Sequence, residues 1–139
     1  MPKFQLDWEI ECDFVLFGIG SHVGSHRLCF DLNRLFGWQL SYDRMIQNLS
    51  KSGATEHIVH RYMDEDLGFD VALILNRVPE GVLASGAYSF DYLLRVRQDV
   101  EEELEIIKTI RKSNLVTLVT SVNPENSGAL DAMFELDKL

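Results

Sequence analysis

Hydrophobic and polar positions along the chain predict a strand and a helix at its start. Residues 14–19 are continuously apolar, which is typical of a buried strand. Residues 28–36 then place apolar side chains at helical spacing, and Gly37 marks the C-terminal end of that helix. Ser21 or Ser25 is suited to cap its N-terminus.

The middle of the chain favours strands joined by turns. The predicted strands of this region are residues 38–42, 56–63, 69–78 and 90–96. The acidic connection 64–68 suits a hairpin, and residues 78–82, with a proline and a glycine, predict a second turn. Residues 47–55 are the most loop-like stretch of the chain.

The last third of the chain predicts a helix followed by a strand. The helix is expected over residues 100–112, where Asp99 and Glu102 have the spacing of a capping box. Its expected core stripe is Val100, Leu104, Ile107 and Ile110. Residues 115–122 alternate as a strand with an apolar face formed by Val116, Leu118 and Val122. Residues 126–134 predict a weak terminal helix.

The resulting order is β-α-β-β-β-β-α-β, which predicts an α+β fold in a single domain over residues 1–139. Each helix has one apolar stripe, so both helices should pack on one face of a mixed, mostly antiparallel sheet. The strand over residues 69–78 is apolar on both sides, so the opposite face also needs a cover. We interpret this need as an indication of a protein partner or a homodimer.

Composition limits the classes of partner. The chain of 139 residues is 46% hydrophobic, which is enough for a core without disulfides. Thirteen Lys and Arg against 22 Asp and Glu give a net charge of -9, so neither nucleic acid nor a membrane is an expected partner. The best candidate for a local basic face is Arg95, Arg97, Lys108, Arg111 and Lys112, but neighbouring glutamates weaken it.

Cysteine usage and the N-terminal sequence indicate a cytoplasmic protein. Cys12 and Cys29 suit reduced thiols better than a disulfide framework. The N-terminal stretch has acidic residues where a signal peptide has basic ones, and no apolar run is long enough to span a membrane.

Candidate chemistry lies where the first strand meets the first helix. The glycines of residues 18–24 would let backbone amides approach an anion, which Arg27 could also bind. The segment lacks a phosphate-loop lysine and a complete GxGxxG motif, so a tight strand-to-helix turn is the favoured explanation of the glycines. We predict a ligand-binding edge at Ser21, His22 and Arg27, shared with Asp91 and Tyr92.

Metal binding and catalysis have weaker support. His22 and His26 are four residues apart, but no third ligand is implied, so no metal or other cofactor is predicted. His57 and His60 should point to opposite faces of a strand. Cys29 lies on the core stripe of its helix, where a thiol is usually inert, so no catalytic residue is predicted and enzymatic activity is left open.

Residues 84–92, ASGAYSFDY, resemble the motif of a bacterial protein family named after it, IPExxxVDY. Asp91 and Tyr92 match the end of that motif, whereas residues 84–86 replace its Ile-Pro-Glu and Phe90 replaces its valine. The N-terminal block is also similar to the family through Gly18, Ile19, Ser21, His22, Arg27, Leu28, Cys29, Leu32 and Asn33. The family has no activity to carry over, so the resemblance implies none.

These observations together favour a non-enzymatic, protein-binding domain that acts as a homodimer or an adaptor, because no set of acid, base and nucleophile converges in the sequence. The alternative is a small-molecule or anion sensor with a pocket near the N-terminus of the first helix.

Overall fold

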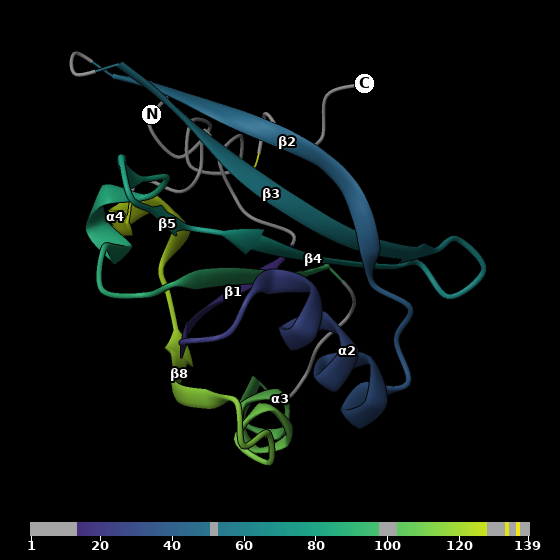
Figure 1. Cartoon of the computed structure of the whole chain (residues 1–139). Helices are drawn as coiled ribbons and strands as arrows, with labels where there is room; N and C mark the ends of the chain where they lie inside the picture. The colour runs from purple at the N-terminus through teal and green to yellow at the C-terminus, as the bar shows by residue number, and fades with distance from the viewer. Residues whose placement is uncertain (1–13, 51–52, 98–102, 128–132, 134–135, 137–139) are drawn as a thin grey trace, which may run out of the picture.

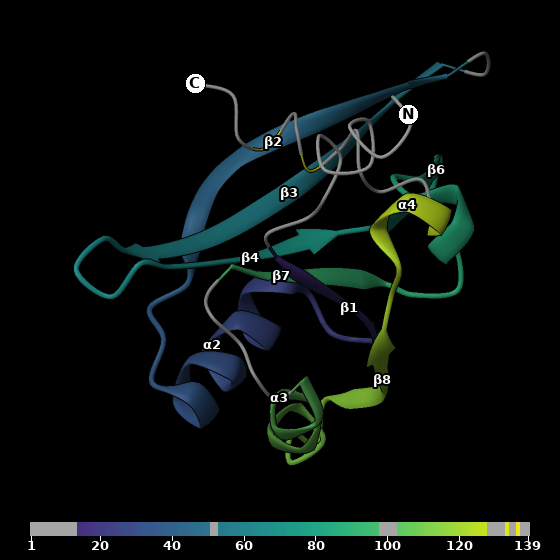
Figure 2. The ribbon, with the colours of Figure 1, turned by 180° about the vertical axis from the view of Figure 1, so that it is seen from behind.

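A six-stranded antiparallel sheet with two helices on one face forms the centre of the fold (Figures 1 and 2). The computed structural model describes residues 14–50, 53–97, 103–127, 133 and 136. The sheet has the order β2-β3-β4-β7-β1-β8. Its strands are β1 (Val15–Ser21), β2 (Ser41–Ser50), β3 (Gly53–Asp64), β4 (Phe69–Leu75), β7 (Tyr92–Arg97) and β8 (Val116–Ser121). The predicted α+β class and the order β-α-β-β-β-β-α-β are confirmed.

The remaining elements are helical or lie at the sheet margin. The helices are α2 (Ser25–Phe36), α3 (Glu103–Ile110) and the short α4 (Pro124–Ser127), with a 3-10 turn, η1, at Ser85–Ala87. The predicted turn over residues 78–82 joins β5 (Arg77–Val78) to β6 (Gly81–Val82) as an antiparallel pair. No helix in the described part of the chain is long and apolar enough to cross a membrane.

The ends of α2 agree only in part with the prediction. Gly37 takes a left-handed conformation, with φ of 76°, and ends the helix as expected. The N-cap residue, however, is Gly24, and no side chain caps the helix. The expectation of a serine cap was therefore wrong, since Ser21 belongs to β1 and Ser25 is already helical.

The largest error in the predicted elements concerns the hairpin of β2 and β3. Its register continues without a loop from Ser41 opposite Arg61 to Ser50 opposite Gly53, so most of the loop predicted over residues 47–55 is paired strand. The strand expected over residues 38–42 begins only at Ser41. The end of β2 forms a strand despite its polar sequence, because it pairs with β3 and because a solvated edge strand tolerates polar side chains. The hairpin projects well beyond the helices (Figures 1 and 2).

The apolar stripe predicted for the second helix is correct only at its end. Ile107 and Ile110 are buried, whereas Leu104 is 68% exposed. The shorter α3 explains this difference, because Leu104 lies in its first turn. The predicted capping box at Asp99 and Glu102 lies outside the described residues, as does Val100.

The strand β8 presents different side chains to the core than predicted. Leu118, expected on the apolar face, is 49% exposed, and Val119 is buried in its place. The cause is an irregularity in the pairing of β1 with β8 between Gly20 and Ser21, which shifts the register and lets both Val116 and Val119 contact the helix-side core.

Two hydrophobic cores lie on opposite faces of the sheet. The helix-side core includes Phe17, Leu28, Leu32, Leu73, Leu94 and Ile110. The second core includes Leu16, Val59, Ala72, Ile74, Leu93 and the cover supplied by Leu83, Ala84, Ala87, Met133 and Leu136. The chain thus covers both faces of β4 itself, so the two-sided apolar strand does not by itself require a partner.

A buried ionic cluster lies on the second face. The carboxylate of Asp70 accepts hydrogen bonds from Arg61 at 3.0 and 2.7 Å and from Arg95 at 2.9 Å, and Arg97 lies 3.5 Å away. The Arg95 side chain is fully buried. Arg95 and Arg97 therefore face Asp70 instead of forming the basic surface considered from the sequence.

We predict that Asp70→Asn destabilises the fold by about 3–5 kcal/mol, because it removes a carboxylate that pairs with both the buried Arg95 and Arg61. Urea unfolding monitored by circular dichroism measures this change. Glu105→Gln is the matched control, since it breaks the solvent-exposed Lys108–Glu105 pair and should leave stability unchanged. Equal stability of Asp70→Asn and the wild type would contradict the role given to the cluster.

Candidate functional site

Three of the five predicted site residues lie together where β1 ends and β7 begins. The backbone N–H of Ser21 donates to one carboxylate oxygen of Asp91 at 2.9 Å, and the other oxygen pairs with Arg77 at 2.6 Å. The Tyr92 hydroxyl donates to the carbonyl oxygen of Val23 at 2.6 Å. These bonds connect β1 and β7 of the six-stranded sheet with the start of β5 and with the segment before α2.

The same network leaves little of Tyr92 and Ser21 open to solvent. Both residues are buried, and burial raises the pKa of Tyr92 to about 12, with the neighbouring Asp91 carboxylate adding to the effect. The Ser21 hydroxyl donates to the carbonyl oxygen of Leu115 at 2.7 Å. A ligand would have to displace these bonds before it could use the same groups.

His22 and Arg27 lie apart from this network. Both are exposed, and His22 precedes α2 instead of forming its first turn. Arg27 borders a small hollow of about 230 Å³, whose lining also includes Phe30, Asp31, Arg34, Asn114 and Leu115. The structure thus brings Ser21, Asp91 and Tyr92 together and leaves the other two predicted residues outside their network.

The glycines between strand and helix have a packing role. A Cβ atom at Gly18 would lie 2.5 Å from the ring of Phe90, so only glycine leaves room for that ring. A Cβ atom at Gly20 would lie 2.9 Å from the hydroxyl oxygen of Thr117. Close contacts with β8 and with the residue before Asp91 therefore explain two of the glycines that suggested an anion-binding loop.

Asn76 is a structural residue that the sequence analysis missed. Its side-chain N–H groups donate to the carbonyl oxygens of Ala87 and Phe90, both at 2.9 Å, and its side-chain oxygen accepts from the N–H of Ala84 at 3.0 Å. Its backbone N–H donates to the carbonyl oxygen of Asp91. Asn76 is fully buried and holds residues 84–91 against the sheet. The available signal was a lone amide at the end of an apolar strand.

The buried histidines have structural surroundings. His57 is fully buried between Thr55, 2.7 Å from its Nε2, and the carbonyl oxygen of Leu75, 2.8 Å from its Nδ1. Since a carbonyl only accepts, Nδ1 carries the proton and Nε2 accepts from the threonine hydroxyl. His60 instead contacts the Tyr42 ring, opposite it on β2. No group of three metal-ligating side chains occurs among the described residues.

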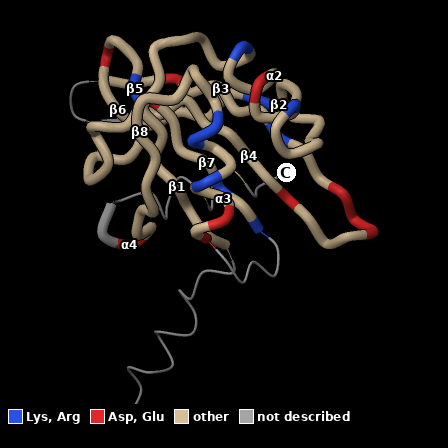
Figure 3. Tube along the Cα trace, turned by 90° about the horizontal axis from the view of Figure 1, so that it is seen from below, with Lys and Arg blue, Asp and Glu red and all other residues tan. Residues whose placement is uncertain are grey.

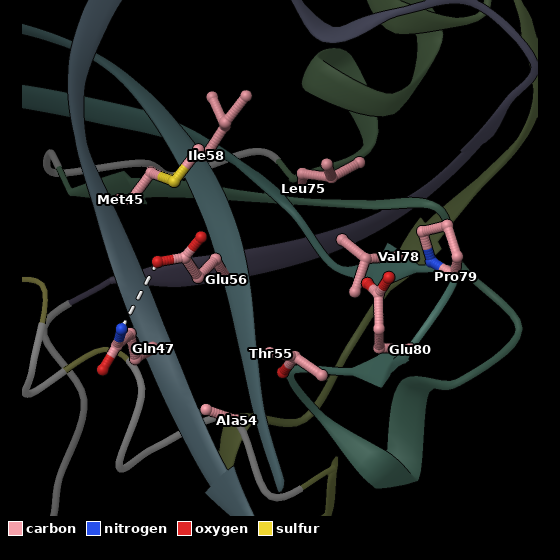
Figure 4. A pocket seen from close by; sticks show the side chains of 10 residues that line it. All are labelled: Met45, Gln47, Ala54, Thr55, Glu56, Ile58, Leu75, Val78, Pro79 and Glu80. Atoms are coloured by element: carbon pink, nitrogen blue, oxygen red, sulfur yellow. Dashed lines mark hydrogen bonds between the residues drawn. The ribbon is translucent and has the colours of Figure 1, made fainter.

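An open groove of about 470 Å³ lies between the β2–β3 hairpin and the turn that joins β5 to β6 (Figure 4). Its lining is Met45, Gln47, Ala54, Thr55, Glu56, Ile58, Leu75, Val78, Pro79 and Glu80. Figure 4 shows Gln47 and Glu56 on the hairpin side and Val78, Pro79 and Glu80 on the other side. Apolar side chains thus lie between polar side chains from two elements.

The sheet register explains why these side chains gather. Met45 is opposite Ile58, and Gln47 is opposite Glu56, so alternate residues of the hairpin point to the same face. Leu75 contacts the helix-side core, which places the groove on the same face as the helices but beyond their cover. The sequence analysis missed the groove because it assigned much of its hairpin wall to a loop.

The close contact between Gly18 and Phe90 predicts a coupling between the two positions. Gly18→Ala should destabilise the fold by about 1–3 kcal/mol, and Phe90→Val should recover part of that loss by removing the ring. A double-mutant cycle by urea unfolding measures the coupling. Gly24→Ala is the control: a Cβ atom there meets nothing within 4 Å, so any effect it has through the N-cap of α2 should simply add to that of Phe90→Val. Additive effects of Gly18→Ala and Phe90→Val would disprove the contact.

Burial also predicts a pH dependence of stability. It lowers the pKa of His57 and of His60, and His26 adds to the effect at His60. In the unfolded chain both imidazoles are protonated near their ordinary pKa of 6.5, whereas in the folded protein they stay neutral to a lower pH. The contribution of these histidines to stability is therefore complete above pH 6.5 and is lost as the pH falls toward their folded-state pKa. Urea unfolding on both sides of pH 6.5 should show this loss, with a smaller loss in the His57→Gln/His60→Gln variant. Equal losses in both proteins would refute it.

Comparisons with known proteins add no functional assignment. No family model matches the chain, and no curated protein sequence is similar to it. The resemblance of residues 84–92 to the IPExxxVDY motif stays a prediction.

Proposed function

We propose that the chain is a non-enzymatic protein-binding domain of the adaptor type, and that the groove beside the β2–β3 hairpin holds a segment of its partner. The observation that carries this proposal is an apolar floor left open on the projecting hairpin. Met45 is 46% exposed there, beside the half-buried Ile58, Leu75 and Val78. Exposed apolar side chains bordered by polar ones are typical of interaction surfaces.

The position of the groove supports a protein segment as the occupant. The groove lies between the β2–β3 hairpin and the β5–β6 turn, so an extended segment can cross it and place side chains against both walls. The open shape of the groove fits a segment better than a small molecule, which usually binds where most of its surface is buried.

Two further observations support an adaptor instead of a homodimer, and a non-enzymatic role in the cytoplasm. The net charge of -9 makes two copies repel each other, which favours an adaptor over a homodimer. Burial raises the pKa of the Cys29 thiol to about 12, which opposes a nucleophilic role and suits a reduced thiol in a cytoplasmic protein.

The proposal predicts that Met45→Asp abolishes partner binding. The matched control is Met63→Asp, because Met63 is 54% exposed on β3 of the same hairpin but does not border the groove. Both tagged variants and the wild type are used to capture proteins from a lysate of the native host. We expect Met45→Asp to reduce the captured partner by at least about tenfold and Met63→Asp to leave it unchanged.

Both variants must first show the circular dichroism spectrum and unfolding midpoint of the wild type. Partner capture that survives Met45→Asp, or that Met63→Asp removes equally, would contradict the groove as the binding surface. Absence of any stoichiometric partner with the wild type would contradict the adaptor function.

We keep an anion sensor as a second candidate because of the hollow beside α2. The hydroxyl of Ser113 and the guanidinium of Arg34 lower the pKa of Asp31, so that carboxylate is engaged within the protein. Arg27, also bordering this hollow, makes no ion pair with a described residue. The sensor predicts a rise in the unfolding midpoint with phosphate that Arg27→Gln removes. A flat response would exclude phosphate as its ligand.

A further inference from the structure

We infer that the partner segment is basic: an extended stretch in which one apolar residue lies between Lys or Arg residues. This inference rests on the proposed function and specifies the chemistry of the occupant. The groove combines an apolar floor with two carboxylates, Glu56 on β3 and Glu80 in the turn between β5 and β6.

Neither glutamate is neutralised within the described part of the chain. The carboxylate of Glu56 accepts one hydrogen bond, from the side-chain amide of Gln47 at 3.3 Å, and makes no ion pair there. Glu80 is exposed and has no Lys or Arg partner among the described residues, since the nearby Arg77 is paired with Asp91. Both carboxylates are therefore free to pair with cations of a ligand, and a ligand carrying carboxylates would be repelled.

The placement of the two carboxylates fits an extended segment. Glu56 lies on the hairpin side of the groove, and Glu80 lies on the opposite side next to Val78 (Figure 4). In an extended chain, alternate side chains point the same way and lie roughly 7 Å apart. An apolar side chain seated on the floor can thus be accompanied by a cationic side chain two residues before it and another two residues after it.

The charge of the whole molecule acts in the same direction. A net charge of -9 attracts a basic segment before contact and speeds its association. Because exposed carboxylates are screened by salt, the attraction should weaken as ionic strength rises.

Three sets of short fluorescent peptides test the inference. Each peptide has one central leucine, isoleucine, methionine or phenylalanine. The residues two positions before and two positions after it are both lysine in the first set, serine in the second and glutamate in the third. Fluorescence anisotropy at low salt measures binding to the full-length protein. We expect the tightest peptides to belong to the lysine set, with at least about tenfold weaker binding in the glutamate set and a marked loss of affinity in added salt.

Charge reversal in the groove makes the test specific. Glu80→Lys should weaken the lysine set and strengthen the glutamate set. Glu65→Lys is the control with the same change of charge, because Glu65 lies in the turn between β3 and β4, at the other end of β3 from the groove. Acidic residues are drawn in red at this turn in Figure 3. The control variant should leave the order of the three sets unchanged.

The outcomes separate this inference from the proposed function. If all three sets bind equally and Met45→Asp abolishes their binding, the groove binds segments but has no preference for basic ones, and the inference is wrong. If binding of the lysine set survives both Met45→Asp and Glu80→Lys, the peptides bind elsewhere, and the inference is again wrong. If no set binds and Met45→Asp also retains the native partner, both the inference and the proposed function fail.

Discussion

The fold depends on covering β4 from both sides. This strand lies inside the sheet between β3 and β7, and its residues from Phe69 to Ile74 are all buried. Burial of this strand stabilises the fold only if apolar surface covers each face, and the chain supplies that surface from distant segments. The helices α2 and α3 cover one face, and residues 83–87 with Met133 and Leu136 cover the other. The hydrogen bonds of Asn76 hold residues 84–91 close to the sheet.

The proposed binding surface is a consequence of the same arrangement. The β2–β3 hairpin extends farther than the two helices, so its outer part has a face that they do not cover (Figures 1 and 2). Met45 and Ile58 lie on this face, and the turn carrying Pro79 and Glu80 forms its opposite wall. The groove therefore combines one apolar floor with acidic residues from two separate elements. The remaining side chains of the hairpin are mostly polar. An apolar hairpin would expose a larger hydrophobic surface at the sheet edge and favour aggregation.

Much of the fold could be predicted from local patterns, and most of the groove could not. The buried strand before Gly20 and the helix end at Gly37 were predictable because burial and a left-handed glycine leave clear local signals. The paired strands over residues 47–55 were not, since pairing with a distant neighbour decides their structure. Asp91 and Tyr92 were correctly singled out, but the partners that engage them lie far away in sequence. A groove built from three segments has no sequence motif at all.

In the proposed binding mode, a basic segment lies between the β2–β3 hairpin and the β5–β6 turn. Backbone ¹H–¹⁵N chemical-shift mapping during titration with the tightest lysine-flanked peptide tests it most directly. The largest shifts are expected at Met45, Glu56, Ile58 and Glu80, while the shifts of the α2 residues Arg27 and Arg34 should stay unchanged. Largest shifts along α2 or β8, with no change along the groove, would contradict it.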